Sequence, residues 1–174
     1  MASAAPVSTG RPLFILLTLL GAGLAVLIQV LPFGTFKDVP LAPVLALVAL
    51  FYWAVYVPEV CPTWVAFLTG LFQDIVSGGP LGLWALVYVV VFRVVLQNRL
   101  LFVGRAAYSG WAGFAMAAIL ATALAWAAGS VYFGQPLSPT PILGQMMVTV
   151  LCYPPLAWIM LKVGRFFGVV EPTL

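Results

Sequence analysis

Few side chains in this sequence of 174 residues could do chemistry. There is no histidine, and the acidic residues and the cysteines are scattered along the chain: Asp38, Glu59, Asp74 and Glu171, with Cys61 and Cys152. Without histidine there is no His-based triad, His metal site or His proton switch, and the cysteines lack the spacing of a metal-binding pair. No nucleophile–base arrangement or phosphate-binding glycine motif is present. We therefore expect no catalysis, no cofactor, no metal and two free thiols.

The composition places the chain in a membrane. Charged residues make up 6% and hydrophobic residues 64% of the sequence, and the mean hydropathy is +1.18. So few charges could not cover the surface of a soluble domain, for which about 25% is usual. The net charge of +3 does not indicate nucleic-acid binding, because the basic residues lie beside apolar runs, as membrane topology requires.

The apolar runs predict a single all-α integral membrane domain over residues 1–174. They are long and lack the alternation that a membrane barrel needs, and a spanning helix takes roughly 20 residues. The first run is longer than the core of a typical signal peptide, so we expect an uncleaved span. The predicted helix bundle has six transmembrane helices, the third of them short, over residues 13–31, 41–57, 62–76, 81–96, 108–133 and 142–161.

The basic residues favour six spans with both termini in the cytoplasm. If the short third segment were re-entrant, five spans would remain, and the positive charges after the fourth segment would move outside. With six spans, only Lys37 faces out, and the cytoplasmic side holds the other basic residues, as the positive-inside rule expects: Arg11, Arg93, Arg99, Arg105, Lys162 and Arg165.

Asp74 is the most informative polar residue, because it ends the third apolar segment just before Ser77-Gly78-Gly79-Pro80, a strong turn signal. A carboxylate at the centre of a membrane helix costs about 2.5–3.5 kcal/mol. One interpretation is a contact with a partner, an ion or a substrate. The interpretation that we favour is a carboxylate that accepts hydrogen bonds from the N–H groups of Ser77, Gly78 or Gly79.

Arg93 is a poor ion-pair partner for Asp74, because it follows the turn by about 12 residues, or ~18 Å of helix. We expect Arg93, Arg99 and Arg105 to contact lipid headgroups instead.

Small residues recur at every fourth position from Ser109 to Gly129, and such rows let membrane helices approach closely. We favour packing inside the bundle for this row, including Gly113, Ala117 and Ala121, over contact with a partner. Gly21 and Gly23 in the first span form a second candidate surface. Pro154 and Pro155 should leave carbonyls near Val150 and Leu151 that need partners inside the protein.

The stretch from Gly70 to Gly82 reads G-L-x-x-D-x-x-S-G-x-P-L-G and resembles the signature region of the MreD family of bacterial rod shape-determining membrane proteins. The length, the short third span and the basic residues after the fourth span also match. The resemblance transfers a role in the turn, or in a partner contact, only to these positions: Gly70, Asp74, Gly78, Pro80 and Gly82.

The resemblance implies a non-catalytic inner-membrane subunit of the cell-elongation machinery that synthesises peptidoglycan. Its implied partners are an MreC-like protein, RodA and the elongation-specific penicillin-binding transpeptidase, with MreB reached indirectly. The implied fold is similar to the membrane substrate-binding subunits of energy-coupling-factor transporters. A scaffold is therefore the favoured function, and a solute-binding transporter subunit is the alternative. The scarcity of polar groups within the predicted spans favours the scaffold.

Overall fold

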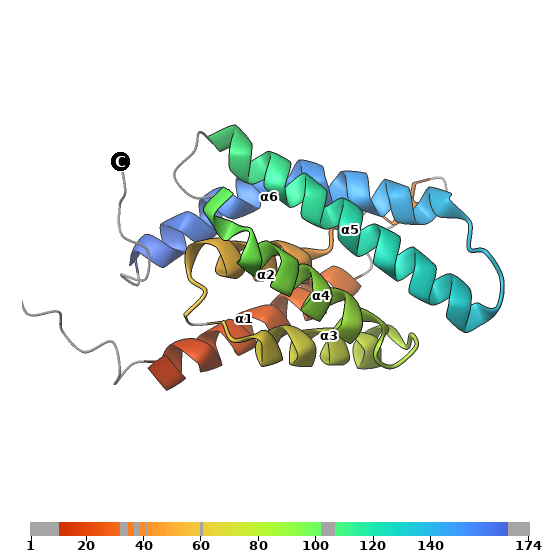
Figure 1. Ribbon diagram of the computed structural model, residues 1–174, viewed down its shortest axis with the longest axis horizontal. Helices are drawn as coiled ribbons and strands as arrows, with labels where there is room; N and C mark the ends of the chain where they lie inside the picture. The colour runs from red at the N-terminus through yellow and green to blue at the C-terminus, as the bar shows by residue number, and fades with distance from the viewer. Residues whose placement is uncertain are drawn as a thin grey trace, which may run out of the picture.

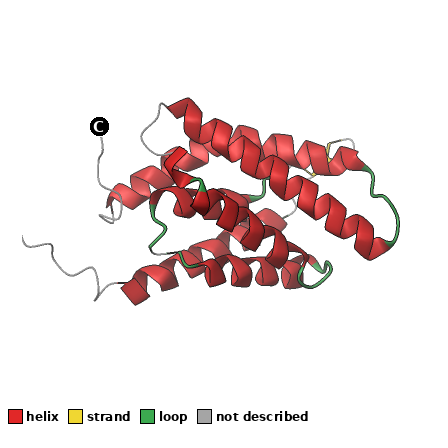
Figure 2. Cartoon of the chain, viewed as in Figure 1, coloured by secondary structure: helices red, strands yellow, loops and turns green. Residues whose placement is uncertain are grey.

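The computed structural model describes residues 11–31, 35–36, 39–40, 42–59, 61–101 and 107–166. These residues form six α-helices joined by short connections (Figures 1 and 2). A 3₁₀ helix, η1 Arg99–Leu101, follows the fourth helix, and two-residue strands, β1 Thr35–Phe36 and β2 Val39–Pro40, pair antiparallel after the first. The prediction of a helical membrane bundle is confirmed. The helices are α1 Arg11–Val30, α2 Leu45–Tyr56, α3 Thr63–Ser77, α4 Leu83–Gln97, α5 Ala107–Phe133 and α6 Pro139–Phe166.

The second helix is shorter than its predicted span, whereas the sixth is longer. The sequence predicts a span over 41–57 and a third helix that is the short one, yet α2 has 12 residues and α3 has 15. Pro43 explains why Ala42 is not helical, because a proline pushes the residue before it out of the helical region. Val44 is not helical either, with ψ 79°, and its N–H donates to the hydroxyl of Thr149 in α6 at 3.0 Å. The sixth helix begins at Pro139, three residues before the predicted start at 142. A proline can occupy the first turn of a helix, because the N–H that it lacks has no acceptor there.

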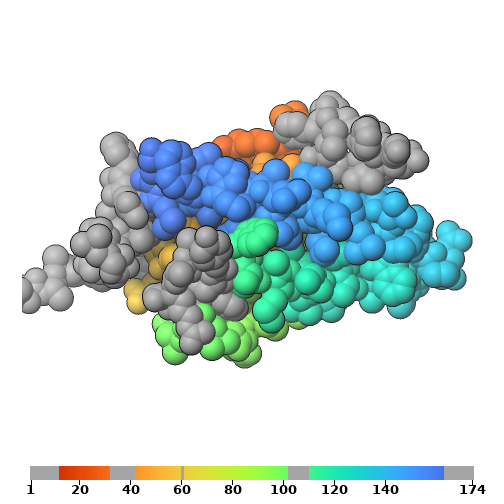
Figure 3. Space-filling view, turned by 90° about the horizontal axis from the view of Figure 1, so that it is seen from above, coloured from red at the N-terminus to blue at the C-terminus, as the bar shows by residue number. Residues whose placement is uncertain are grey.

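The helices form three layers, with α1 and α3 in the first, α2 and α4 in the second, and α5 and α6 in the third (Figure 1). Nine of the twelve residues of α2 are buried, as expected of a helix that is apolar all round. Phe51 of α2 meets the stacked rings of Phe114 and Tyr153 edge-on, with ring centroids 5.3 and 5.7 Å away. Figure 3 shows α5 and α6 side by side across one face of the molecule.

Successive helices run in alternating directions. The start of α1 and the end of α6 lie at one end of the bundle, on the left in Figure 1, and the connection between α2 and α3 lies there too. The α3–α4 turn and the α5–α6 loop lie at the opposite end, on the right in Figure 2. Three stretches of helix are long and apolar enough to cross a membrane, namely Pro12–Val30, Gly110–Phe133 and Pro139–Lys162, and α2 and α4 are shorter apolar helices.

One of the two prolines inside α6, Pro154, is accommodated by a contact with α5. Pro154 lacks the N–H that would bond to the carbonyl of Val150. That carbonyl instead accepts a hydrogen bond from the indole Nε1 of Trp111, at 3.1 Å. The prediction that a freed carbonyl here finds a partner inside the protein is confirmed for Val150.

Candidate functional site

The carboxylate of Asp74 caps the first turn of α4. Its Oδ2 accepts hydrogen bonds from the backbone N–H groups of Gly82 at 2.8 Å and Ala85 at 3.5 Å, and its Oδ1 accepts one from Trp84 at 2.9 Å. The first N–H groups of a helix lack intrahelical acceptors and lie at the positive end of its dipole. Only 1% of Asp74 is exposed, so this cap supplies the polar partners that a buried carboxylate needs.

The donors predicted for Asp74 were wrong. The carboxylate does accept a hydrogen bond from a backbone N–H group of the turn, that of Gly82. We expected the N–H groups of Ser77, Gly78 or Gly79, and the carboxylate instead reaches across to the following helix. The reason is that α3 ends in a left-handed residue, Gly78 with φ 67°, which turns the chain back over the end of α3. The start of α4 is thereby brought onto Asp74.

The turn depends on a second left-handed glycine. Gly82 has φ 94°, a conformation that residues with a Cβ rarely adopt, and it immediately precedes α4. Its carbonyl accepts the N–H of Leu86 at 2.9 Å, and the carbonyl of Pro80 accepts the N–H of Leu83 at 3.2 Å. Gly78, Pro80 and Gly82 therefore shape the backbone that presents N–H groups to Asp74.

Gly70 brings α3 and α4 into close contact one helical turn before Asp74. A Cβ at this position would lie 2.4 Å from the Cα of Ala85 and 2.5 Å from its N. No side chain fits at such distances, so glycine is required for the two backbones to approach this closely. The contact places Ala85 next to Asp74 as well as next to Gly70.

Next to Asp74, a buried amide joins three helices. Oε1 of Gln73 accepts a hydrogen bond from Nε2 of Gln29 in α1, at 2.6 Å, and another from the hydroxyl of Tyr88 in α4. Gln29 also accepts a bond from the backbone N–H of Ala46 in α2, at 3.5 Å. Neither Gln73 nor Tyr88 was predicted from the sequence to be a site residue. The available signal was Gln73 itself, a second polar residue beside Asp74 in an apolar helix.

A family model described as "rod shape-determining protein MreD" matches residues 10–163 of the chain. The chain belongs to the MreD family. The resemblance drawn from the Gly70–Gly82 signature is confirmed, and with it a role in determining rod shape. No match is found among curated proteins or among solved structures. The expected similarity to energy-coupling-factor transporter subunits therefore stays a prediction.

In this MreD chain the signature residues lie together at one turn, whereas the predicted helix-packing residues lie on two different surfaces. Gly113, Ala117 and Ala121 of α5 are buried. On α1, a Cβ at Gly21 would lie 3.6 Å from the ring of Trp53, and one at Gly23 would lie 3.9 Å from Phe72. The α5 residues thus face the inside of the bundle, and Gly23 faces a groove between α1 and α3.

The predicted basic cluster is only partly within the described structure. Arg93 is exposed on α4, and Arg99 is half-buried in η1. Arg105 lies outside the described residues. Within the described ranges no ion pair joins Arg93 to Asp74, whose two oxygens are occupied by backbone N–H groups. At the end of α6, the ammonium of Lys162 lies 3.8 Å from the ring centroid of Trp158.

The remaining reactive groups are two separate thiols. Cys61 is buried in the connection between α2 and α3, and Cys152 is half-buried in α6; both are free, as predicted. Burial raises the pKa of the Cys61 thiol to about 12, so little thiolate forms at neutral pH. Among the described residues, no group of three or more Cys, Asp and Glu side chains could hold a metal ion.

Proposed function

We propose that this MreD-family chain is a non-catalytic membrane scaffold of the bacterial cell-elongation machinery. On this proposal the chain binds the transmembrane helix of an MreC-like protein. RodA and the elongation penicillin-binding transpeptidase are further partners in the same assembly, and MreB contacts the chain only indirectly, through the MreC-like protein. Family membership supports the role in rod shape. The engagement of Asp74, Gln73 and Tyr88 in contacts between helices supports a structural use of the signature region.

The proposed topology has six spans in the bacterial inner membrane, with both termini in the cytoplasm. The alternating helix directions support it, because they place Arg93 and Arg99 towards the same end of the bundle as the start of α1 and the end of α6. There, Arg93, Arg99 and Arg105 would contact anionic lipid headgroups. Reporter fusions after Leu174 and at Gly79 should report opposite sides of the membrane, and the same side for both would contradict six spans.

The groove between α1 and α3 is the surface that we propose for the partner helix. It has a volume of about 460 Å³ and lies on the outside of the bundle. Its walls are apolar apart from Thr69, whose hydroxyl donates to the carbonyl of Val65 at 2.7 Å. This groove is the observation that carries the proposal, and its lining is Leu19, Leu20, Gly23, Leu24, Leu27, Leu68, Thr69 and Phe72.

Two features favour this groove over the row of small residues on α5. Membrane helices associate through close packing at small residues, and Gly23 lies on the groove with only Phe72 near its missing side chain. Ala117 and Ala121, by contrast, are 4% and 2% exposed and pack within the bundle. A partner helix could reach Gly23 without rearrangement of the core, whereas it could not reach Ala117 or Ala121.

Substitution of Gly23 by leucine tests this surface. Gly23→Leu should fill the groove and abolish co-purification of the MreC-like protein while the chain keeps its normal level in the membrane. Ala127→Leu, on the exposed side of α5, is the matched control and should leave co-purification unchanged. If Gly23→Leu retains the partner, or if both variants lose it equally, the groove is not the partner site.

A further inference from the structure

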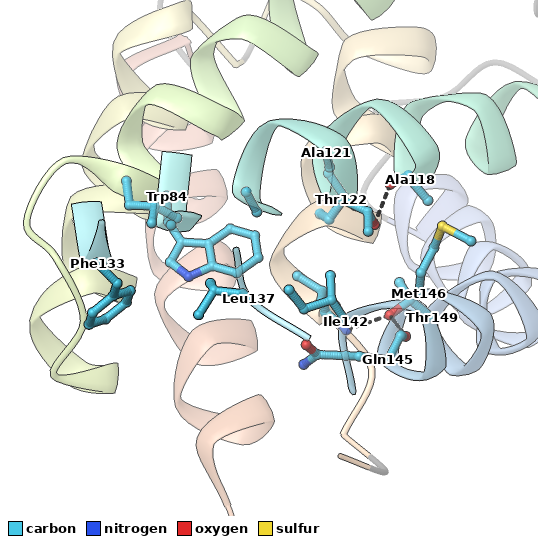
Figure 4. Close-up of a pocket in the computed structure, with 15 residues that line it drawn as sticks. Trp84, Ala118, Ala121, Thr122, Phe133, Leu137, Ile142, Gln145, Met146 and Thr149 are labelled. Carbon is cyan, nitrogen blue, oxygen red and sulfur yellow. Dashed lines mark hydrogen bonds between the residues drawn. The ribbon is translucent and has the colours of Figure 1, made fainter. Parts of the chain in front are cut away.

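Two hollows lie on opposite sides of the seam between α5 and α6. The inner one is a cavity of about 190 Å³ between these helices and the starts of α2 and α4 (Figure 4). The outer one is a groove of about 360 Å³ on the outside of the same seam. Both are lined by Thr122, Ile142 and Met146. These three side chains therefore lie between the two hollows.

The inner cavity exists because α5 presents small residues to it. Ala118, Ala121, Ala125 and Gly129 form its α5 wall, and the indole ring of Trp84 lies across from them (Figure 4). A dry apolar cavity of about 150 Å³ is large enough to hold a benzene molecule. A space of this size accordingly suits several carbons of a hydrocarbon chain.

Three polar side chains around the inner cavity, those of Thr122, Gln145 and Thr149, bond to other groups of the protein. Thr149 accepts the backbone N–H of Val44 at 3.0 Å and donates to the carbonyl of Gln145 at 2.7 Å. Nε2 of Gln145 donates to the backbone carbonyl of Ala42 at 3.3 Å. The hydroxyl of Thr122 donates to the backbone carbonyl of Ala118 at 2.7 Å. These contacts leave walls that are mainly apolar, which favours a hydrocarbon over a polar solute.

The outer groove faces the surroundings of the bundle. Ile119 and Leu143 on its rim are 56% and 46% exposed, and α5 and α6 both contain stretches that are long and apolar enough to cross a membrane. The indole of Trp126 donates to the carbonyl of Leu137 at 2.9 Å, which fixes one end of the groove. On the proposed topology, a groove at this position is open to the hydrocarbon of the bilayer.

We propose that one lipid hydrocarbon chain lies in the outer groove and that its end passes Met146 into the inner cavity. Methionine is unbranched and flexible, so it is the wall residue best able to move aside. The site is distinct from the partner groove on α1 and α3, and it does not depend on the proposed scaffold function. It would hold a lipid more firmly than the smooth surface of a helix does.

Filling the inner cavity tests this site. Ala125→Leu adds three carbons to the cavity wall and should displace about three carbons of the bound chain, which weakens binding on the order of 50-fold. Ala127→Leu is the same change two positions along α5, at an exposed residue that lines neither hollow. Native mass spectrometry of the detergent-purified chain should then show a retained lipid in the wild type and in Ala127→Leu, and its loss in Ala125→Leu.

A fluorescence measurement keeps the test decisive if Ala125→Leu folds poorly. Trp84 lines the inner cavity but not the outer groove, so phosphatidylglycerol with bromine at the chain ends should quench its fluorescence, measured as the quenching that is present in the wild type and lost in Trp84→Phe. Aqueous iodide should not quench it. Quenching by iodide alone, or equal lipid retention in Ala125→Leu and Ala127→Leu, would overturn the proposal.

Discussion

The carboxylate of Asp74 near the end of α3 accepts the backbone N–H of Gly82, the residue before α4, at a distance of 2.8 Å. One side chain thereby joins the end of one helix to the beginning of the next. With the close approach at Gly70 and the amide of Gln73, it makes the α3–α4 hairpin a fixed unit against which α1 packs.

Removing the carboxylate should destabilise this hairpin. Asp74→Asn keeps one oxygen acceptor and loses the charge, so we expect a decrease of about 1–2 kcal/mol in the free energy of unfolding, typical of a lost cap. Asp74→Leu leaves all three N–H groups without their acceptor and should cost several times more. Thermal unfolding in detergent and membrane abundance measure the difference. Equal loss of rod-shape complementation at normal abundance in both variants would indicate a charge-dependent partner contact instead.

Gly70→Ala should be far more damaging than its small size suggests. The new Cβ would lie 2.4 Å from the backbone of Ala85, so α3 and α4 must separate, and overpacking typically costs about 1–3 kcal/mol or more. Gly79→Ala is the matched control, because its Cβ would meet only the Ser77 hydroxyl oxygen at 3.6 Å. If the two variants have the same unfolding temperature, the close approach at Gly70 is not important for stability.

The amide of Gln73 should matter more than either of its donors. Tyr88→Phe removes one hydrogen bond, and we expect it to cost about 1 kcal/mol. Gln73→Leu leaves both the Tyr88 hydroxyl and the Gln29 amide without their acceptor, which should cost about 2–4 kcal/mol. Denaturant titration of each variant in detergent checks the order. A Gln73→Leu protein as stable as Tyr88→Phe would show that water or another group replaces the amide.

Cys61 should be nearly inert to thiol reagents at neutral pH. Burial raises its pKa to about 12, and only the thiolate reacts. The labelling rate in a Cys152→Ala variant should therefore keep rising about tenfold per pH unit above pH 9, where an ordinary thiol with a pKa of about 8.5 has levelled off. The same variant unfolded in sodium dodecyl sulfate is the control. A plateau near pH 9 in the folded protein would contradict the buried position of Cys61.

The sequence could place the turn but not the partners of its residues. The glycines and the proline between Ser77 and Gly82 indicate a turn by their backbone preferences alone, and an apolar run with few charges indicates a helix in a membrane. The donors to Asp74 lie 8 to 11 residues further along the chain. They depend on how the hairpin closes, which no local preference records.

The contacts of Gln73 were harder still to predict. Its partners Gln29 and Tyr88 are 44 and 15 residues away, and only the packing of three helices brings them together. Part of the late start of α2 was within reach of the sequence, because Pro43 restricts Ala42. The small residues of α5 predicted close packing, but their repeat could not show that some of them pack in the core while Ala125 and Gly129 line a cavity.

Site-specific photo-crosslinking in membranes tests most directly whether a partner helix occupies the groove between α1 and α3. A photoreactive residue at Leu24 or Leu68 lies on the groove, and one at Trp158 lies on the exposed face of α6, away from it. We predict crosslinks to the MreC-like protein from Leu24 and Leu68 and none from Trp158. Crosslinks from Trp158, with none from Leu24 or Leu68, would contradict the account.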